Sequence, residues 1–430
     1  MNMSTQNLRI LSVSTSDSKG GASIAAFRLH NSINKHCKEI ESNLLVARKY
    51  RNHKNIIPYY YKYKKLIYFS KLYFSRRIQS LQRTTNSIAH SGNYFPSFIH
   101  KYINKYPTDI IHLHWVQDEF LPVNSISKIK KPLLWTLHDS WPFCGSEHHP
   151  KINDNRYVEG YNISNREKIY LKSFRNLLFN PDLDCFNWKM KKKLSHKNIT
   201  FVAPSKWMRE CISKSYLFKN KDCEIIPNPV PETFYSAFNK TRIFARKYSN
   251  LPLKKPIFIF VANRADLDVN KGWHLLENIL KELSRVLDFH LLTIGGQCKI
   301  ELFGKSTHEI KKRVDSITDL SLLYRSADLL LLPSLIETLP QVATECITTG
   351  TPVIAFKGSG TEDVVINGIT GLLVNRFDEK HFYESILEII SMDREKFGNS
   401  CFSYSSSNWK EEIIVNKFRS LYYKILKKNY

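Results

Sequence analysis

Short apolar runs alternate with longer amphipathic segments along the whole chain. The runs lie at 8–13, 109–116, 132–137, 199–203, 256–262, 289–294, 329–332 and 353–356. Runs of this length are typical of strands buried in a parallel sheet, and the segments between them have the length of connecting helices. The pattern therefore predicts an α/β chain with parallel sheets.

The segment 327–374 carries the clearest order of elements. A strand at 329–332 is followed by a loop with Glu337, a helix with Glu345, a strand at 353–356 and a glycine loop that includes Gly358 and Gly360. Ligands of open parallel sheets bind beyond the carboxyl ends of the strands. Two carboxylates eight residues apart can accept hydrogen bonds from one polyhydroxylated ligand. Two surface acids on a helix are the simpler alternative.

Gly20 and Gly21 follow the first strand and precede a helix expected at 22–35. Such glycines let the backbone approach a ligand phosphate, although they are equally consistent with a plain tight turn. The G-x-G-x-x-G fingerprint of dinucleotide-binding proteins is missing, which disfavours an NAD oxidoreductase.

Two other strand ends carry polar candidates. His138 follows the strand 132–137, with Asp139 and Trp141 after it. A histidine at a strand's carboxyl end is better placed for a ligand than His112 or His114, which lie within a strand. Cysteines and histidines at 144, 148, 149 and 185 are too irregularly spaced to predict a metal site.

Lys271 and Gly272 precede a helix, where a cation and free N–H groups can together hold a phosphate. Arg264 is the nearest arginine before them. The segments 266–268 and 182–184 have the Asp-x-Asp form of a metal-binding motif, but neither has a context that favours that function.

Charge and cysteine usage narrow the setting. The 430 residues include 64 Lys and Arg against 39 Asp and Glu, a net charge of +25 that favours anionic partners. The 8 cysteines form no C-x-x-C pair, so a disulfide framework is not expected. No signal peptide or membrane-spanning run is recognisable, and we expect a cytoplasmic protein.

The segment 58–83 interleaves Tyr and Phe with Lys and Arg, and Leu66, Phe69 and Tyr73 recur at helical spacing. A basic aromatic helix of this kind can lie on an anionic membrane surface. It can also pack on its own domain, and its composition suits single-stranded nucleic acid, for which the chain has no recognisable module.

Three stretches together resemble the family 4 glycosyltransferases, which are retaining enzymes of the GT-B fold. They are 132–145 with TLHDSWPFCG, 199–230 with IIPNPV, and 324–374. The first looks like a branch that acts in bacterial surface polysaccharide synthesis of the colanic acid or lipopolysaccharide type. The resemblance implies two Rossmann-like domains that face a central cleft. Residues 1–228 would form the acceptor domain and 229–409 the nucleotide-sugar domain, with a last helix at 410–430 that crosses back to the first domain.

The resemblance also implies roles for single residues. Glu345 would bind the ribose, Glu337 the donor sugar and Lys271 the diphosphate, and His138 would approach the donor sugar. Further donor contacts would come from Arg264, Thr338, Leu339, Gln341, Gly20, Gly21, Gly358 and Gly360, and acceptor-side contacts from Asp139 and Trp141. The chain departs from many relatives at Asp266, where they have arginine, and at Thr338-Leu339, where they have Phe-Gly.

The implied reaction moves a hexose from a nucleotide-sugar to a growing surface glycan or a lipid-linked acceptor with retention of configuration. It needs no cofactor and no essential metal, because positive side chains and helix ends act on the leaving diphosphate. The alternatives are another GT-B enzyme, namely a nucleotide-sugar epimerase or a phosphorylase, and a basic nucleic-acid-binding protein. We expect no nucleic-acid partner and a location at the inner face of the cell membrane.

Overall fold

Two compact units make up the protein, whose computed structural model describes residues 7–60, 63–167, 180–263 and 265–429. The first unit comprises Met1–Pro227 with Val415–Tyr430, and the second comprises Asn228–Ile414. The boundary thus lies beside the predicted position 228, while the C-terminal segment joins the first unit from Val415 instead of from residue 410.

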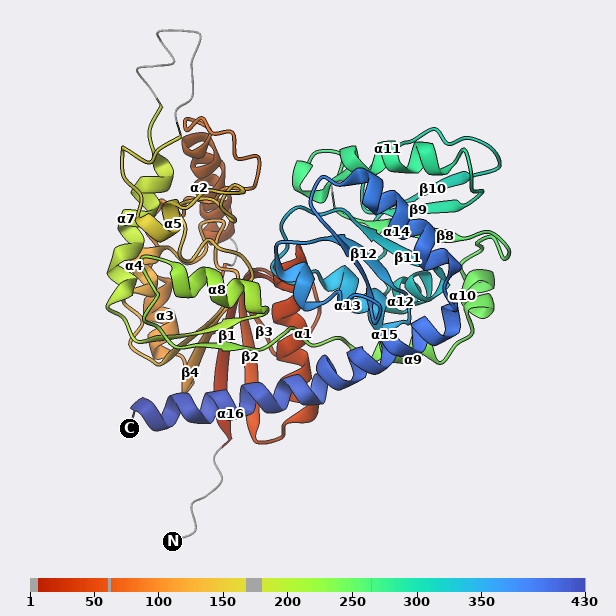
Figure 1. Ribbon diagram of the computed structural model, residues 1–430. Coiled ribbons are helices and arrows are strands. Elements are labelled where there is room, and N and C mark those ends of the chain that lie inside the picture. Colours follow the sequence, from red (N-terminus) through yellow and green to blue (C-terminus); the bar gives the residue numbers. More distant parts are fainter. Residues whose placement is uncertain (1–6, 61–62, 168–179, 264, 430) are drawn as a thin grey trace. The chain divides into compact units, whose positions relative to one another are not determined.

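The first unit is built on a parallel sheet that has seven strands in the described part of the chain (Figure 1). Its order is β3-β2-β1-β4-β5-β6-β7, and every pairing is parallel. The strands are β1 (Leu8–Ser16), β2 (Ile40–Arg48), β3 (Ile56–Pro58), β4 (Ile110–Leu113), β5 (Leu133–Thr136), β6 (Ile199–Ala203) and β7 (Cys223–Ile225). The direction of strand addition reverses between β1 and β4, which makes their carboxyl ends a topological switch point.

Helices connect these strands. They are α1 (Gly21–His36), α2 (Tyr63–Gln79), α3 (Ile99–Lys105), α4 (Val123–Ile126), α5 (Arg156–Glu159), α7 (Leu183–Ser195) and α8 (Lys206–Lys214). The last helix, α16 (Glu411–Asn429), begins in the second unit and packs on the first. Its Tyr422 hydroxyl lies 2.8 Å from Nδ1 of His112 in β4, and both side chains are buried. The predicted return of the C-terminal helix is confirmed.

The second unit has a parallel sheet of six described strands in the order β10-β9-β8-β11-β12-β13. They are β8 (Ile257–Val261), β9 (His290–Ile294), β10 (Thr307–Lys311), β11 (Leu329–Leu332), β12 (Val353–Phe356) and β13 (Gly371–Val374). Its switch point lies between β8 and β11, whose carboxyl ends precede the loops with Lys271 and Glu337.

The helices of the second unit fall into two groups by their contacts. In one, α11 (Trp273–Leu283) packs against α14 (Glu379–Ser391). The other comprises α9 (Glu232–Phe238), α10 (Arg242–Tyr248), α12 (Ile317–Ser326), α13 (Gln341–Thr348) and α15 (Arg394–Asn408). Single 3₁₀ turns, η1 (Val269–Lys271) and η2 (Gly360–Asp363), precede α11 and follow β12.

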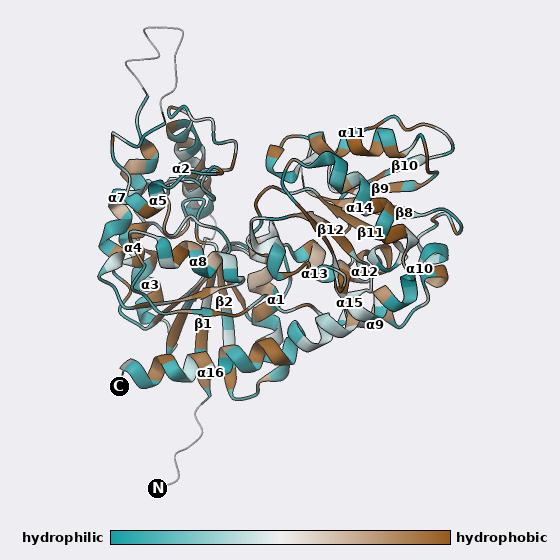
Figure 2. Ribbon diagram, in the orientation of Figure 1, coloured by the Kyte–Doolittle hydropathy of each residue, from teal (hydrophilic) through white to brown (hydrophobic). Residues whose placement is uncertain are grey.

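Apolar strands form the centre of each unit. All four residues of β11 are buried, and Figure 2 shows the strands β11 and β12 as mostly brown. Burial of one such leucine side chain contributes about 1.5–3 kcal/mol. The continuous apolar runs were therefore a reliable signal for the central strands.

A buried carboxylate joins four elements of the second unit. Asp328, just before β11, accepts hydrogen bonds from Arg242 at 2.7 Å, Arg246 at 2.5 Å, Arg394 at 2.7 Å and the backbone N–H of Ile257 at 2.7 Å. Removing one partner of a buried charge pair costs about 3–5 kcal/mol because the other charge stays buried. Asp328 thus fixes α10 and α15 to the sheet that carries the candidate donor site.

No helix in the described residues is both long enough and apolar enough to cross a membrane.

Candidate functional site

The loops at the switch point of the second sheet bring a lysine and a glutamate into contact. Lys271 ends η1 after β8, and Glu337 lies in the loop after β11. Nζ of Lys271 donates to Oε1 of Glu337 at 2.7 Å. Their side chains are 27% and 18% exposed, so the pair lies at the surface of the second unit with access to a ligand.

Two glycines make this contact possible by close approach of the backbone. Gly272 has a φ of +70°, and a Cβ there would lie 2.0 Å from the carbonyl oxygen of Pro333. A Cβ on Gly360 would lie 1.9 Å from the carbonyl oxygen of Thr338. The Gly360 N–H also donates to the Glu337 carbonyl at 2.8 Å. The three loops therefore fit together only with glycine at both positions.

Asn270 and Ser359 lock the same loops and were missed in the sequence. The amide of Asn270 donates to the Ile336 carbonyl at 2.9 Å and accepts from the Ile336 N–H at 2.9 Å. The hydroxyl of Ser359 accepts from the Glu337 N–H at 3.2 Å. Two features of the sequence could have pointed to these residues: Asn270 precedes the candidate Lys271, and Ser359 lies between two glycines.

The pKa of the Lys271 amine is raised. Burial lowers it, but the Glu337 carboxylate and Asp268 outweigh that effect. Lys271 is therefore charged at neutral pH, and its charge is compensated by a carboxylate that a bound phosphate could replace.

Other predicted donor residues lie around this pair. Glu345 is 5% exposed in α13, Thr338 and Leu339 are buried before it, and Gln341 is its first residue. The helix begins without a side-chain cap, and the N–H groups of Ala343 and Thr344 both donate to the Pro340 carbonyl at 3.1 Å. Arg264 lies outside the described residues.

The side chains of Arg376 and Glu362 hold the glycine loop after β12. Gly358 has a φ of +99°, its carbonyl accepts from the guanidinium of Arg376, and its N–H donates to Glu362 at 2.5 Å.

In the first unit, Gly20 has a φ of +90° before α1, and a Cβ there would meet nothing within 4 Å. Gly20 and Gly21 are exposed after the carboxyl end of β1, and their contact with a ligand stays a prediction.

His138 forms a pair with His114 at the carboxyl ends of β5 and β4. Nε2 of His138 lies 3.0 Å from Nδ1 of His114, and the rings stack at 5.3 Å. Burial lowers the pKa of His138 to about 4 and that of His114 well below its ordinary value. At neutral pH both rings are uncharged, and one donates to the other. His112 is a satisfied core group, bonded to Thr136 and Tyr422.

Asp139 is 6% exposed and accepts four hydrogen bonds. They come from Nε1 of Trp115 at 3.0 Å, Nε2 of Gln117 at 3.1 and 2.9 Å, and the backbone N–H of Trp141 at 3.1 Å. Burial raises the pKa of Asp139 to about 7, and these hydrogen bonds limit the rise. Asp139 joins the loops that follow β4 and β5.

Trp141 is fully buried. Its Nε1 donates to the Ser91 carbonyl at 2.7 Å, and the ammonium of Lys191 lies 3.7 Å from the ring centroid. A side chain without exposed surface cannot contact an acceptor unless the loop moves. The predicted acceptor role of Asp139 stays a prediction, and the position of Trp141 favours support of the loop over direct contact.

The rejected metal motifs have separate structural partners. Asp268 caps η1, and Asp182 caps α7 and pairs with Arg156 at 2.6 Å. The thiol of Cys185 donates to the Tyr161 carbonyl. His148 and His149 lie at 2.8 and 3.0 Å from the hydroxyls of Ser91 and Ser140. Asp184, the second acid of the Asp-x-Asp segment 182–184, instead contacts Ser146 and Gln82.

Two protein-family models match the chain. The model "Glycosyltransferase Family 4" matches residues 68–234, and the model "Glycosyl transferases group 1" matches residues 241–401. An uncharacterised 41.2 kDa protein in the cps region of Klebsiella pneumoniae is 24% identical over 287 residues, which are 62% of this chain and 74% of that protein.

Solved structures share the fold. Sucrose-phosphate synthase from Thermosynechococcus elongatus has a TM-score of 0.65 at 17% identity, with 98% of this chain and 100% of that chain covered. Anabaena Alr3699/HepE in complex with UDP-glucose has a TM-score of 0.60 at 14% identity, with 97% and 100% covered. The α/β GT-B prediction is confirmed.

The burial of Asp139 predicts a pH dependence of stability. Its pKa is about 7 in the folded chain and about 3.9 when unfolded. The folded state binds this proton more tightly, so the free energy of unfolding falls as pH rises from about 4 to about 7, by at most about 4 kcal/mol. In Asp139→Asn this contribution is absent. Urea unfolding at several pH values should therefore show a smaller decline in the free energy of unfolding for this variant than for wild type.

The exposed Glu159→Gln, also in the first unit, is the matched control and should keep the wild-type decline. Equal pH slopes in wild type and Asp139→Asn would show that Asp139 is ionised throughout.

Proposed function

Because the chain belongs to the glycosyltransferases of the GT-B fold, we propose that it transfers a hexose from a nucleotide-sugar to a growing surface glycan or a lipid-linked acceptor, with retention of anomeric configuration. The observation that carries this proposal is the Lys271–Glu337 pair at the switch point of the second sheet. A charged amine and a carboxylate on adjacent loops match the two halves of such a donor, its diphosphate and its sugar.

The donor binds at the carboxyl edge of the second sheet. Lys271 and the uncapped start of α13 hold the diphosphate, Glu337 binds sugar hydroxyls, and Glu345 binds the ribose. That HepE, a protein of the same fold, was solved with UDP-glucose supports a nucleotide-sugar as the donor.

Donor binding rearranges the ion pair. The amine of Lys271 moves from the Glu337 carboxylate to the diphosphate, which frees Glu337 to accept hydrogen bonds from the sugar. As the glycosidic bond to the diphosphate breaks, the amine and the helix N–H groups stabilise the charge that develops on the leaving group. The acceptor hydroxyl attacks from the face that the diphosphate leaves, and the diphosphate oxygen takes its proton.

This chemistry needs no cofactor and no metal at the donor site, because Lys271 supplies the positive charge. The acceptor is a glycan of the cell surface type, in line with the relative in a Klebsiella cps region. His138, neutral and at the carboxyl end of β5, donates a hydrogen bond to a sugar hydroxyl.

The enzyme contacts the inner face of the cell membrane through α2. Tyr68 and Leu72 pack this helix on its own unit, whereas Leu66, Tyr73 and Phe74 are 74%, 54% and 55% exposed. Further exposed groups are Ile67, Phe69, Lys64, Lys65, Arg76 and Arg77. Apolar side chains among cations are typical of a helix at an anionic lipid interface. This surface brings a lipid-linked acceptor to the enzyme.

Donor binding is tested with a panel of UDP-, GDP-, ADP- and dTDP-sugars by calorimetry. We expect one nucleotide class to bind selectively, and Glu345→Ala to weaken its binding by about tenfold or more through loss of hydrogen bonds to a charged group. The exposed Glu384→Ala in α14 is the control of equal charge and should bind as wild type. No binding of any panel member would contradict the proposed donor site.

Lys271→Ala should lower kcat by about 10²-fold or more with little change in the melting temperature, since it removes stabilisation of the leaving diphosphate. Turnover is measured with the donor identified by the panel. Lys281→Ala, whose amine pairs with Glu277 in α11, is the matched control. Undiminished transfer by Lys271→Ala would remove this residue from the mechanism.

Membrane contact is tested by sedimentation with vesicles of phosphatidylglycerol and phosphatidylcholine. Wild type should bind the anionic vesicles and release them at high salt, and the double variant Leu66→Glu, Phe74→Glu should bind much less because it buries charge at the interface. Val286→Glu, at a 67% exposed position of the second unit, should bind as wild type. Equal binding of both variants would exclude α2 as the contact surface.

A further inference from the structure

One largely buried and two buried side chains of the first unit converge outside the site described above. Residues 89–91 and 146–148 pair as an antiparallel bridge, in which His90 lies opposite Glu147. Asp184 approaches from the first turn of α7. One ligand atom from each residue lies within 4.8 Å of the other two. The side chains of His90 and Asp184 are 9% and 8% exposed, and Glu147 is 3% exposed.

The tautomer of His90 directs a lone pair into this cluster. Its Nδ1 lies 2.6 Å from the carbonyl oxygen of Ile88, which can only accept, so Nδ1 carries a proton. Nε2 is buried and has no hydrogen-bond partner among the described residues, and it lies 3.9 Å from Oδ1 of Asp184. A histidine oriented by a backbone carbonyl in this way is the usual arrangement of a metal ligand.

The two carboxylates are oriented in the same manner. Oε1 of Glu147 accepts from the hydroxyl of Tyr161, while Oε2 is buried without a partner in the described part of the chain. Asp184 accepts from the N–H and hydroxyl of Ser146 and from the amide of Gln82, whose oxygen in turn accepts from the Asp184 N–H at 3.0 Å. These contacts fix the carboxylates and leave Oε2 of Glu147 and Nε2 of His90 without a hydrogen-bond partner in the described part of the chain.

Lys191, a fully buried cation of the first unit, is already engaged. Its ammonium donates to the carbonyls of Trp141, Cys144 and Gly145. It stabilises the loop before Glu147 but donates to neither carboxylate there. Three acceptors that converge in a buried place repel one another unless a positive species lies between them.

We propose that His90, Glu147 and Asp184 bind a divalent metal ion of the Zn²⁺ or Mn²⁺ type. One imidazole nitrogen with two carboxylate oxygens suits these ions, whereas Ca²⁺ takes six to eight oxygens. Ligands at about 2.1 Å from a tetrahedral ion lie about 3.4 Å apart. Side-chain movements of roughly 1 Å from the separations seen here complete that geometry.

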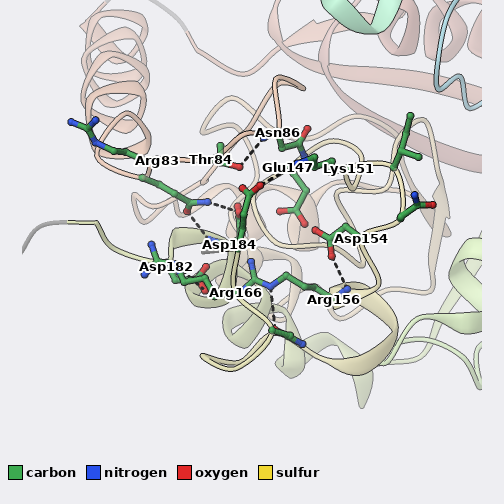
Figure 3. A pocket seen from close by; sticks show the side chains of 15 residues that line it. Arg83, Thr84, Asn86, Glu147, Lys151, Asp154, Arg156, Arg166, Asp182 and Asp184 are labelled. Atoms are coloured by element: carbon green, nitrogen blue, oxygen red, sulfur yellow. Dashed lines mark hydrogen bonds and ion pairs between the residues drawn. The ribbon is translucent and has the colours of Figure 1, made fainter. Parts of the chain in front are cut away.

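The remaining coordination position faces a polar pocket. Glu147 and Asp184 line this cavity of about 280 Å³ together with Lys151, Asp154 and Arg156 (Figure 3). Water or a hydroxyl of a bound glycan can complete the coordination sphere from there. The ion would also tie α7 to the loop that runs from His138 to His148, whose Nδ1 lies 3.5 Å from Asp139.

The test uses the full chain after chelation and dialysis. Mn²⁺ binding is followed by the loss of the free-ion EPR signal, and Zn²⁺ by competition. We expect about one ion per chain, a higher melting temperature with the ion, and binding at least about tenfold weaker in Glu147→Gln and Asp184→Asn. Glu167→Gln, which removes a carboxylate of the same pocket outside the cluster, should bind as wild type.

If a variant does not fold, the wild-type protein alone can still test the proposal. A chelator should lower its melting temperature, and Zn²⁺ should restore it. Absence of saturable binding by wild type, or equal binding by wild type, Glu147→Gln and Asp184→Asn, would overturn the proposal and indicate a cluster bridged by protons. Donor binding at Lys271 is measured separately, so either proposal can fail alone.

Discussion

Close backbone approach at the switch point of the second sheet is the constraint on which the candidate donor site depends. Gly272 lies against Pro333, and Gly360 lies against Thr338, at distances that exclude a side chain. Only with these contacts do the loops after β8 and β11 come near enough for Lys271 to reach Glu337. Parallel strands supply the shared edge, and glycine supplies the final approach.

Much of this edge could be predicted from the sequence. The buried strands are short apolar runs, and a residue that follows such a run must lie at the carboxyl edge, so Lys271 and Glu337 could be placed there. The amphipathic edge strand β10 gave no such signal, because its residues are partly exposed and include charged side chains. The role of Asn270 could not be predicted either, because its amide binds the backbone of a residue 66 positions away in the sequence.

The first unit was harder to predict because burial, not residue type, decides the chemistry there. His138 was placed correctly at the end of β5, but its neutral pairing with His114 depends on the depth of both rings. Asp139 looked like a ligand-facing acid, yet donors from the neighbouring loop surround it. Trp141 was predicted as an acceptor-side contact and is fully buried.

The charged groups at the two candidate sites differ in how they are compensated. At Lys271 a carboxylate compensates the amine at a partly exposed position, so in the proposed donor complex a diphosphate would replace one anion by another at little electrostatic cost. At His90, Glu147 and Asp184 the acceptors converge and are stable only with a proton or a metal ion between them, and the proposed ion would take that place. Asp184 belongs to the Asp-x-Asp segment 182–184, but His90 and Glu147 lie far from it in the sequence, so spacing alone could not predict this cluster. An ion there would act on the loop with His138 and Asp139 through position alone, by holding its far end against α7.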